Sequence, residues 1–348
     1  MTKTRPQKCC RNMKELNMSH EMLKREIGRS GIEASAIGLG TWAIGGWMWG
    51  GTDEARSIAA IQASIEAGVS LIDTAPAYGQ GVAEEIVGKA IKDRRDKVVL
   101  ATKCGLVWHT QKGNHFFDYD GAPVHRYLGK DAIIYEVEQS LTRLGTDYID
   151  HYITHWQDPT TPIAETMEAL EQLKTQGKIR SIGASNTTPL DVRAYLEAGQ
   201  LDAVQEEYSM VNRAVEAEMA PLCHENGVSI LSYSSLALGL LTGKIGPDRV
   251  FEGDDQRKDN PRFSIANREK VARLMEAIAH IAEVHGATKA QVVIAWTLQQ
   301  PGITFSLCGA RDATQAVENA KAGLLRLSAD DIARISGAAS THLSDLDG

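Results

Sequence analysis

The sequence lacks several features that would assign it to other classes of protein. It contains no stretch of about 18 apolar residues, the minimum for a membrane-spanning helix. The longest nearly apolar run, VSILSYSSLALGLL at residues 228–241, is interrupted by serines. The formal net charge is −8, so the basic surface typical of nucleic-acid-binding proteins is missing as well. We therefore expect no membrane partner and no nucleic-acid partner.

Cysteine is also scarce, and no C-x-x-C pair occurs among the 5 cysteines of the chain. An odd number of scattered cysteines indicates free thiols in a reducing compartment rather than a disulfide framework. We therefore expect a cytoplasmic protein. Cys104 follows a lysine that is discussed below, and two interpretations of it stay open. It is a small buried hydrophobic residue or, as the alternative, a reactive thiol.

The first 25 residues differ from the rest because they are rich in lysine and arginine and have few acidic residues. They contain no apolar core of the kind found in a secretory signal. We expect residues 1–22 to be a disordered extension or the result of a mis-assigned start, with Met13, Met18 and Met22 as possible alternative starts. We expect residues 23–340 to form a single domain. A basic recognition arm is the alternative interpretation of the extension.

Beyond residue 25, short apolar runs alternate with longer amphipathic stretches. Alternation of this kind indicates parallel strands joined by helices, and eight repeats favour an α/β fold of the (β/α)₈ TIM-barrel type. The predicted strands are 35–40, 69–74, 97–103, 147–155, 179–185, 201–205, 228–233 and 303–309. Clear amphipathic helices are predicted at 53–68, 129–145, 162–177 and 267–286.

Three other segments complete the predicted barrel. LKREIGRSGIEAS resembles a hairpin that turns at Gly28–Gly31, and we expect it to close the floor of the barrel. Two loops, at 105–128 and 243–266, are longer than the usual connections. Long loops in a compact domain are commonly functional or disordered. We expect these two loops to be functional and to lie at the active site.

The segment GLGTWA at residues 38–43 fits the dinucleotide fingerprint G-x-G-x-x-A. A true fingerprint requires a helix that begins inside the glycine loop, so that the helix N-terminus meets the pyrophosphate. Here the next helix is predicted to begin only near Asp53, after a glycine- and tryptophan-rich stretch. We therefore reject the fingerprint and expect Trp42, Trp47 and Trp49 to form an aromatic wall beside a pocket, or simply a packed loop.

Residues that can take part in acid–base chemistry lie at the ends of three predicted strands. Asp73 ends the second strand with Tyr78 shortly after it, Lys103 ends the third strand and His155 the fourth. Function in barrels of this type gathers at the carboxyl ends of the strands. We expect Lys103 to lower the pKa of Tyr78, because a cation about 4 Å away at an effective dielectric near 20 contributes roughly 4 kcal/mol, or about three pKa units. Asp73 would hold Lys103, and His155 would orient a substrate oxygen.

A metal-dependent hydrolase is one alternative, because His151 and His155 share a face of the same strand. Their Cα atoms would lie about 13 Å apart at roughly 3.3 Å per residue. That distance is too long for two ligands of one ion. We therefore expect no metal.

Several motifs occur together and in order: GLGTW, LIDTAPAYG, VVLATK, DYIDHYITHW, GKIRSIGASN, VQEEYS, SYSSLALGLLTGKI and CGARDATQAVEN. In this combination the chain resembles the aldo-keto reductase superfamily from about Leu23 to about Leu327. DDQRKDNPRF is similar to the branch that contains aryl-alcohol dehydrogenase-like and general-stress members. The resemblance implies reduction of aldehydes and ketones to alcohols with NADP(H) or NAD(H). The cofactor would lie extended across the barrel mouth.

The resemblance also implies roles for individual residues. Tyr78 matches the general acid, Lys103 and Asp73 its partners, and His155 the residue that orients the carbonyl. The implied cofactor-binding residues are Thr41, Trp42, Asp73, Ser185, Asn186, Gln205, Tyr233, Ser234, Leu236, Gly309, Ala310, Arg311, Gln315, Glu318 and Asn319. The expected substrate pocket consists of Trp42, Trp49, Tyr78, Trp108, His155 and Trp156.

One departure from the family concerns the cofactor. Many members have a Lys-Ser pair where this chain has Gly309-Ala310, so the lysine that pairs with a 2′-phosphate is absent. Arg311 is the expected replacement because a guanidinium binds phosphate in a bidentate manner. We therefore expect NADP(H), with NAD(H) as the alternative.

Substrate identity and assembly stay open at this stage. Small aldehydes, aryl aldehydes and keto-sugars all suit an aromatic pocket, and both a monomer and a homo-oligomer are compatible with the sequence. The resemblance also extends to β-subunits of potassium channels. A cofactor-sensing regulatory module is therefore the alternative to an enzyme.

Overall fold

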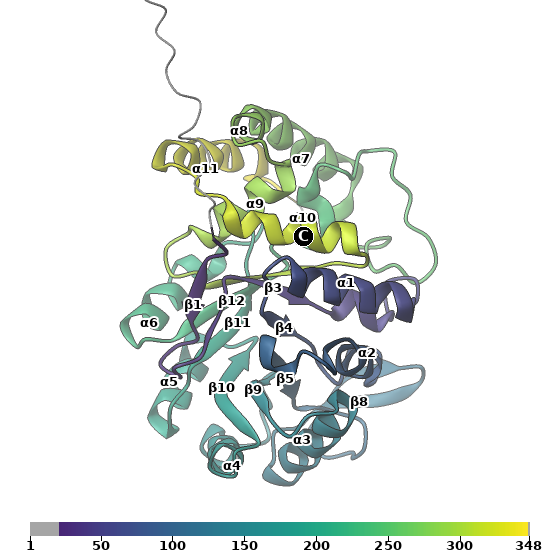
Figure 1. The fold of residues 1–348 in the computed structure, drawn as a ribbon, viewed down its shortest axis with the longest axis vertical. Coiled ribbons are helices and arrows are strands. Elements are labelled where there is room, and N and C mark those ends of the chain that lie inside the picture. Colours follow the sequence, from purple (N-terminus) through teal and green to yellow (C-terminus); the bar gives the residue numbers. More distant parts are fainter. Residues whose placement is uncertain (1–20, 347–348) are drawn as a thin grey trace, which may run out of the picture.

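Eight parallel strands close into a barrel in the computed structural model of the protein, which describes residues 21–346 (Figure 1). The predicted (β/α)₈ fold is confirmed. All but the last two residues of the predicted 1–22 extension lie outside the described residues, and the domain boundary at residue 23 stays a prediction. Around the barrel the strands are β3 (Ile37–Gly40), β4 (Leu71–Asp73), β5 (Val99–Cys104), β9 (Ile149–Thr154), β10 (Ile179–Ser185), β11 (Ala203–Glu207), β12 (Ser229–Tyr233) and β13 (Phe305–Gly309).

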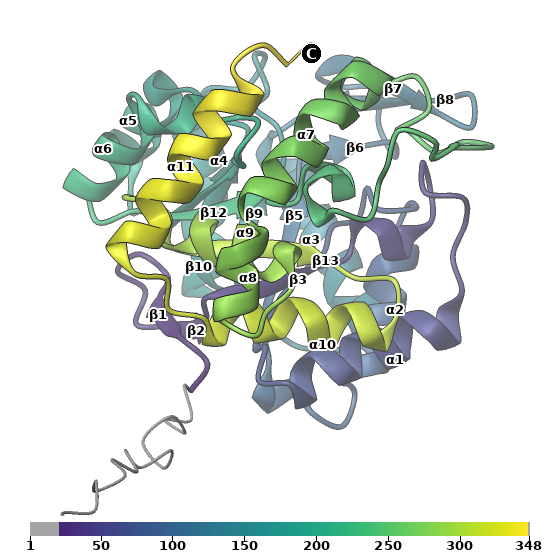
Figure 2. The ribbon, with the colours of Figure 1, turned by 90° about the horizontal axis from the view of Figure 1, so that it is seen from above.

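Helices surround the barrel and connect its strands (Figure 1). They are α1 (Glu54–Glu66), α2 (Val82–Ile91), α3 (Lys130–Leu144), α4 (Ile163–Thr175), α5 (Pro189–Ala198), α6 (Met219–Glu225), α7 (Ile265–Ala277), α8 (Ala279–Val284), α9 (Lys289–Leu298), α10 (Ala313–Lys321) and α11 (Ala329–Leu343). The single helix predicted at 267–286 is instead two helices, α7 and α8, which meet at Ile278. Helix α11 packs beside α7, as Figure 2 shows. None of the described helices is both long and apolar enough to cross a membrane.

The predicted N-terminal hairpin is formed by β1 (Lys24–Glu26) and β2 (Glu33–Ser35). Its turn requires glycine at position 28, where φ is +57° and a Cβ would lie 2.1 Å from the carbonyl oxygen of Asp202. Ile27 is fully buried and packs with apolar side chains of the barrel interior. The hairpin therefore closes the floor of the barrel, as expected.

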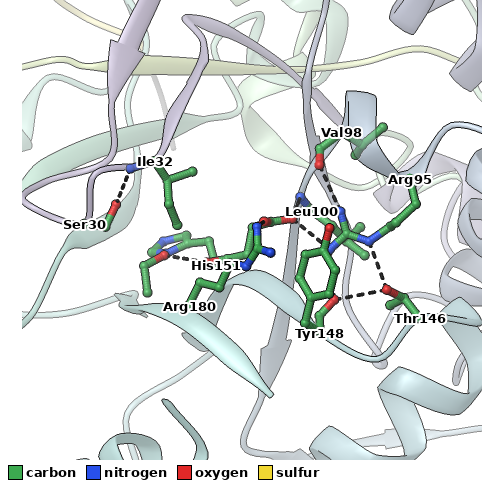
Figure 3. Close-up of polar contacts among 11 residues, drawn as sticks. Ser30, Ile32, Arg95, Val98, Leu100, Thr146, Tyr148, His151 and Arg180 are labelled. Carbon is green, nitrogen blue, oxygen red and sulfur yellow. Dashed lines mark hydrogen bonds and ion pairs between the residues drawn. The ribbon is translucent and has the colours of Figure 1, made fainter. Parts of the chain in front are cut away.

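A polar cluster braces the same end of the barrel (Figure 3). Asp150, near the start of β9, forms ion pairs with Arg95 at 2.8 Å and Arg180 at 3.0 Å. Both guanidinium groups also lie over the ring of Tyr148, at 4.0 and 3.8 Å from its centroid. His151 donates to or accepts from Ser181 in the same layer. Side chains at this end therefore pair with each other and serve stability.

The loop predicted at 105–128 is not irregular, because it contains a three-stranded antiparallel sheet. Its strands are β6 (Leu106–Val107), β7 (Asn114–Tyr119) and β8 (Ala122–Arg126), in the order β6-β8-β7. Asp120 and Gly121 join β7 to β8 with φ of 47° and 78°. Positive φ at both central residues is what a two-residue type I′ hairpin turn requires.

The segment GLGTWA does not form a dinucleotide fingerprint in the structure. Residues Trp42–Gly45 form a short 3-10 helix, and α1 begins at Glu54 with Asp53 as its N-cap. No α-helix therefore starts inside the glycine loop, and its rejection as a fingerprint is confirmed.

The alternation of side chains along the strands determines which residues point into the barrel at its mouth. The apolar interior of the barrel contains Leu71, Ala101, Ile153, Ala203, Leu231 and Leu307. Successive side chains of a strand point to opposite faces, so residues two positions further along point inward again, one layer closer to the mouth. These residues are Asp73, Lys103, His155, Gln205, Tyr233 and Gly309.

Candidate active site

Lys103 is the centre of the polar layer, and it is completely buried. Its Nζ donates to both carboxylate oxygens of Asp73 at 2.9 and 2.8 Å, and to the carbonyl oxygen of Thr74 at 2.9 Å. It also donates to the hydroxyl oxygen of Tyr78 at 3.1 Å. A lysine has three N–H donors, so all of them are used. The structure thus brings three of the four predicted catalytic residues into hydrogen-bond contact.

Burial sets the charge states of the tyrosine and the lysine. Burial raises the pKa of Tyr78; Lys103 lowers it and the charge of Asp73 raises it, with a net result above the usual value. Lys103 acts in the predicted direction, but the predicted net lowering of the tyrosine pKa is wrong, because burial and Asp73 outweigh the cation. Burial lowers the pKa of Lys103 itself, but Asp73 and Tyr78 reverse this and leave it raised. Lys103 is therefore a cation.

His155 lies beside Tyr78, with ring centroids 5.7 Å apart and the rings perpendicular. Burial, and then the charge of Lys103, place the pKa of His155 well below its usual value. The imidazole is therefore neutral and can donate one hydrogen bond and accept another. The second histidine of the strand, His151, is buried two layers below His155, where its Nδ1 lies 2.9 Å from the hydroxyl of Ser181. It is part of the barrel interior and does not reach the mouth.

Cys104, which follows the lysine, is almost fully buried. Burial raises the pKa of its thiol well above the usual value, and the charge of Glu136 adds to this effect. A thiol is reactive as its thiolate, so these observations support the interpretation of Cys104 as a buried hydrophobic residue.

A cavity of about 720 Å³ opens above this layer. Aromatic rings from three segments form one wall: Trp42, Trp47 and Trp49 after β3, Phe116 and Phe117 in β7, and Trp156 after β9. Trp42 stacks on Tyr78 with centroids 6.4 Å apart, and Trp47 stacks on Phe117 at 5.3 Å. The expected aromatic wall therefore exists, and it adjoins the tyrosine. Trp108, which directly follows β6, does not line the cavity, so its place in the expected substrate pocket is wrong.

Most of the predicted cofactor residues line the same cavity. They are Trp42, Asp73, Ser185, Asn186, Gln205, Tyr233, Ser234, Leu236, Gly309, Arg311, Gln315, Glu318 and Asn319. Thr41 and Ala310 do not line it, and both are buried. Thr41 instead donates from its hydroxyl to the carbonyl oxygen of Asp73 at 3.0 Å.

Two observations test whether an extended dinucleotide fits. Gly40 and Gly309 are paired across β3 and β13 and line the cavity side by side, and a Cβ at Gly40 would meet no atom within 4 Å, so it would project into open space. At the far end, one carboxylate oxygen of Glu318 is buried without a hydrogen-bond partner, while the other accepts from Lys244 at 2.8 Å. The wall thus leaves room for a flat ligand and keeps an acceptor for an N–H group. The open space at Gly40 and the free acceptor of Glu318 both fit a dinucleotide.

Sequence reasoning missed the contribution of the loop between β12 and α7. Lys244, Arg249 and Arg257 line the cavity and add to the positive charge of Arg311. Asp254 of this loop accepts from the backbone N–H groups of Met48 at 3.2 Å and Gly50 at 3.0 Å. The basic residues were visible in the sequence, but nothing local showed that the loop reaches the tryptophan-rich segment.

A (β/α)₈ barrel with a buried Lys-Asp-Tyr cluster and a dinucleotide-sized cavity at its mouth defines a barrel oxidoreductase. A sequence profile described as "Aldo/keto reductase family" matches residues 36–340. The chain belongs to the aldo/keto reductase family, and it is an NAD(P)H-dependent oxidoreductase.

Relatives and solved structures agree with this assignment. Aldo-keto reductase YhdN of Bacillus subtilis (strain 168) is 44% identical over 288 residues, which cover 82% of this chain and 84% of that protein. NADH-specific methylglyoxal reductase of Escherichia coli (strain K12) is 42% identical over 316 residues, with coverage of 89% and 96%.

Among solved structures, glycerol dehydrogenase AKR11B4 from Gluconobacter oxydans superposes with a TM-score of 0.83 at 34% identity, covering 93% of this chain and 97% of that one. An aldo/keto reductase from Klebsiella pneumoniae in complex with NADP and acetate gives a TM-score of 0.67 at 30% identity, covering 89% and 92%.

Proposed function

We propose that the protein reduces the carbonyl group of small aldehydes and ketones to an alcohol, with Tyr78 as the proton donor. The observation that carries this proposal is the 3.1 Å contact between the ammonium of Lys103 and the phenol of Tyr78 at the base of the cavity. The cofactor, when bound, supplies the hydride from its nicotinamide ring. The contribution of the chain is then to bind, to orient and to move a proton.

The proton chemistry follows from the charge states of the cluster. Because the pKa of Tyr78 is above its usual value, the phenol holds its proton at neutral pH. As negative charge develops on the substrate oxygen, Tyr78 transfers this proton and becomes a phenolate next to Lys103. The neutral imidazole of His155 donates a hydrogen bond to the same oxygen and fixes its position. Alcohol oxidation needs the phenolate at the start, so we expect the reverse reaction to become faster as the pH rises.

We propose NADP(H) as the preferred cofactor. Arg311 and Arg249 line the cavity, at whose far end Lys244 pairs with Glu318, and we place the adenosine end of the cofactor there. A 2′-phosphate carries charge that these side chains can neutralise. The Klebsiella structure contains NADP, whereas the Escherichia coli relative is named as NADH-specific. We further propose a cytoplasmic location, which rests on the unpaired cysteines of the described chain.

The decisive experiment replaces Tyr78 by phenylalanine. Loss of a general acid lowers kcat by about 10²–10⁴-fold, and we expect this loss with cofactor affinity changed less than about twofold. Tyr135→Phe, on the exposed face of α3, is the matched control and is expected to behave like the unmodified protein. Full turnover by the Tyr78→Phe protein would refute the role of Tyr78. A panel of methylglyoxal, aryl aldehydes and keto-sugars, each with NADPH and NADH, would compare kcat/KM and identify the substrate class.

A further inference from the structure

Gln205 and Asp73 form a hydrogen bond across the full width of the barrel. The amide Nε2 of Gln205 donates to Oδ1 of Asp73 at 2.8 Å. Gln205 lies on β11 and Asp73 on β4, and the strand order places these two strands four positions apart in either direction. The two side chains therefore extend from opposite sides of the barrel and meet in its mouth. Both residues are 3% exposed, so the bond is shielded from water.

The orientation of the Gln205 amide follows from its partner. A carboxylate only accepts hydrogen bonds, so the nitrogen end of the amide must face Asp73. The oxygen end has no hydrogen-bond partner within residues 21–346, and the side chain lines the cavity. One amide group therefore holds the catalytic carboxylate at one end and keeps an acceptor at the other.

The neighbouring amide, that of Asn186, already forms hydrogen bonds within the protein. Asn186 donates from Nδ2 to the carbonyl oxygen of His155 at 2.8 Å and to the hydroxyl of Ser185 at 3.1 Å. Its Oδ1 accepts from the hydroxyl of Tyr233 at 2.8 Å. Asn186 thus ties Tyr233 to the main chain beside His155. Of these two amides, Gln205 is the one with an acceptor left for a ligand.

The position of Asp73 matters because it directs Lys103. Both oxygens of Asp73 accept from the ammonium, and the ammonium also donates to Tyr78. A hydrogen bond accepted by the Gln205 oxygen polarises the amide and strengthens the bond that its nitrogen donates. More of the Asp73 charge is then satisfied by Gln205, and more of the Lys103 charge acts on Tyr78.

We propose that Gln205 is a positioning residue that couples the seating of the nicotinamide carboxamide to the Asp73–Lys103 pair. This inference rests on the proposed function, because it assigns the carboxamide N–H₂ group as the donor to the Gln205 oxygen. Gln205 therefore does more than bind the cofactor: when the nicotinamide ring is in place, it increases the effect of the Lys103 charge on Tyr78.

The test compares Gln205→Met with the unmodified protein and uses three ligands. Methionine has a similar length and makes neither hydrogen bond. The ligands are NADP⁺, its 3-acetylpyridine analogue, in which a methyl group replaces the carboxamide N–H₂, and 2′-phospho-ADP-ribose, which has no ring. Their Kd values are measured by quenching of tryptophan fluorescence between pH 8 and 11.5, a range that extends above the usual pKa of a tyrosine because the pKa of Tyr78 is raised. The readout does not depend on turnover.

Three results are expected in the binding experiment. The unmodified protein prefers NADP⁺ over the acetylpyridine analogue by about tenfold, and the Gln205→Met protein loses this preference. The preference of the unmodified protein changes with pH as Tyr78 titrates, because coupling between two sites is reciprocal. Affinity for 2′-phospho-ADP-ribose is unchanged within about twofold, which shows that the variant is folded.

Turnover gives a second, independent readout. At saturating cofactor and substrate we expect kcat of the Gln205→Met protein to fall at least tenfold, and the alkaline limb of its pH profile to move to higher pH. A residue that only binds the carboxamide would raise the cofactor Kd but leave kcat and the pH profile unchanged. That result would overturn the inference.

Two further outcomes are distinguishable. If Gln205→Met loses affinity for 2′-phospho-ADP-ribose, Gln205→Asn takes its place, because it keeps the amide group but is one methylene too short to hold the same hydrogen bond to Asp73. The inference then requires kcat to fall by a larger factor than cofactor affinity, and equal losses would overturn it. If the unmodified protein reduces no carbonyl substrate, the proposed function fails, while the pH-dependent preference for the carboxamide still decides the inference.

Discussion

The Lys103–Asp73 ion pair permits a quantitative prediction about stability. The charged atoms are 2.8 Å apart, and both side chains are almost completely buried. At an effective dielectric near 20 the Coulomb attraction is about 6 kcal/mol, which the cost of removing both charges from water largely offsets. Removal of one partner leaves the other charge buried and unpaired, at a cost of about 3–5 kcal/mol.

We therefore expect Lys103→Met and Asp73→Leu each to lower the free energy of unfolding by about 3–5 kcal/mol. The double variant replaces the pair by apolar side chains, so it should lose much less than the sum. It still leaves the buried amide nitrogen of Gln205 without its acceptor, which costs about 1–3 kcal/mol. The difference between the double variant and the sum of the single variants should exceed about 3 kcal/mol.

Urea unfolding followed by circular dichroism at pH 7 measures this coupling. Gln205→Met provides the control, since it removes a hydrogen bond to Asp73 without removing a charge. We expect all variants at Lys103 or Asp73 to lose turnover, so stability and activity should separate in the double variant. Additive losses would show that the two charges are solvated in the folded protein, and the argument from burial would then be refuted.

Two other predictions concern the cofactor and the pH dependence of stability. Arg311→Gln removes a cation from the adenosine end of the cavity, so the ratio of Kd for NADH to Kd for NADPH should fall about tenfold, and an unchanged ratio would exclude Arg311 as the phosphate ligand. Burial raises the pKa of Glu136 to about 8, while its oxygen accepts from the N–H of Gly105 at 2.8 Å. Because this pKa is higher in the folded protein than in the unfolded chain, the free energy of unfolding is highest below about pH 4.5 and falls as the pH rises to 8. The fall is roughly 3–5 kcal/mol, at about 1.4 kcal/mol per pKa unit. Glu136→Gln should therefore be more stable than the unmodified protein at pH 8.5 and equal to it at pH 4.5 in thermal unfolding, and a difference that does not vary with pH would contradict the assignment.

The cluster of Asp73, Lys103 and Tyr78 could be predicted because it depends on local patterns. The residues that end strands are visible in the sequence, and the alternation of side chains in a closed barrel brings Asp73, Lys103 and His155 to one rim. The hairpin between β7 and β8 could also have been predicted. Asp120-Gly121 is a strong turn signal, and it lies between residues that pair across two strands.

Other features of the site have no local signal. The bond between Gln205 and Asp73 joins residues that are 132 positions apart, and it exists because two strands face each other across the barrel. The clamp of Asp254 on the tryptophan-rich segment likewise depends on the path of a loop. The direction of the Tyr78 pKa was misjudged because the sequence shows a nearby lysine but not how completely the phenol is removed from water.

The brace formed by Asp150, Arg95, Arg180 and Tyr148 stands at one end of the barrel, and the reacting groups stand at the other. The brace thus contributes to folding without touching the groups that are proposed to react. We therefore expect changes in the loops at the mouth to leave the contacts of this brace intact. Substrate preference would then be set by the loops at the mouth, while the opposite end of the barrel keeps the strands in register.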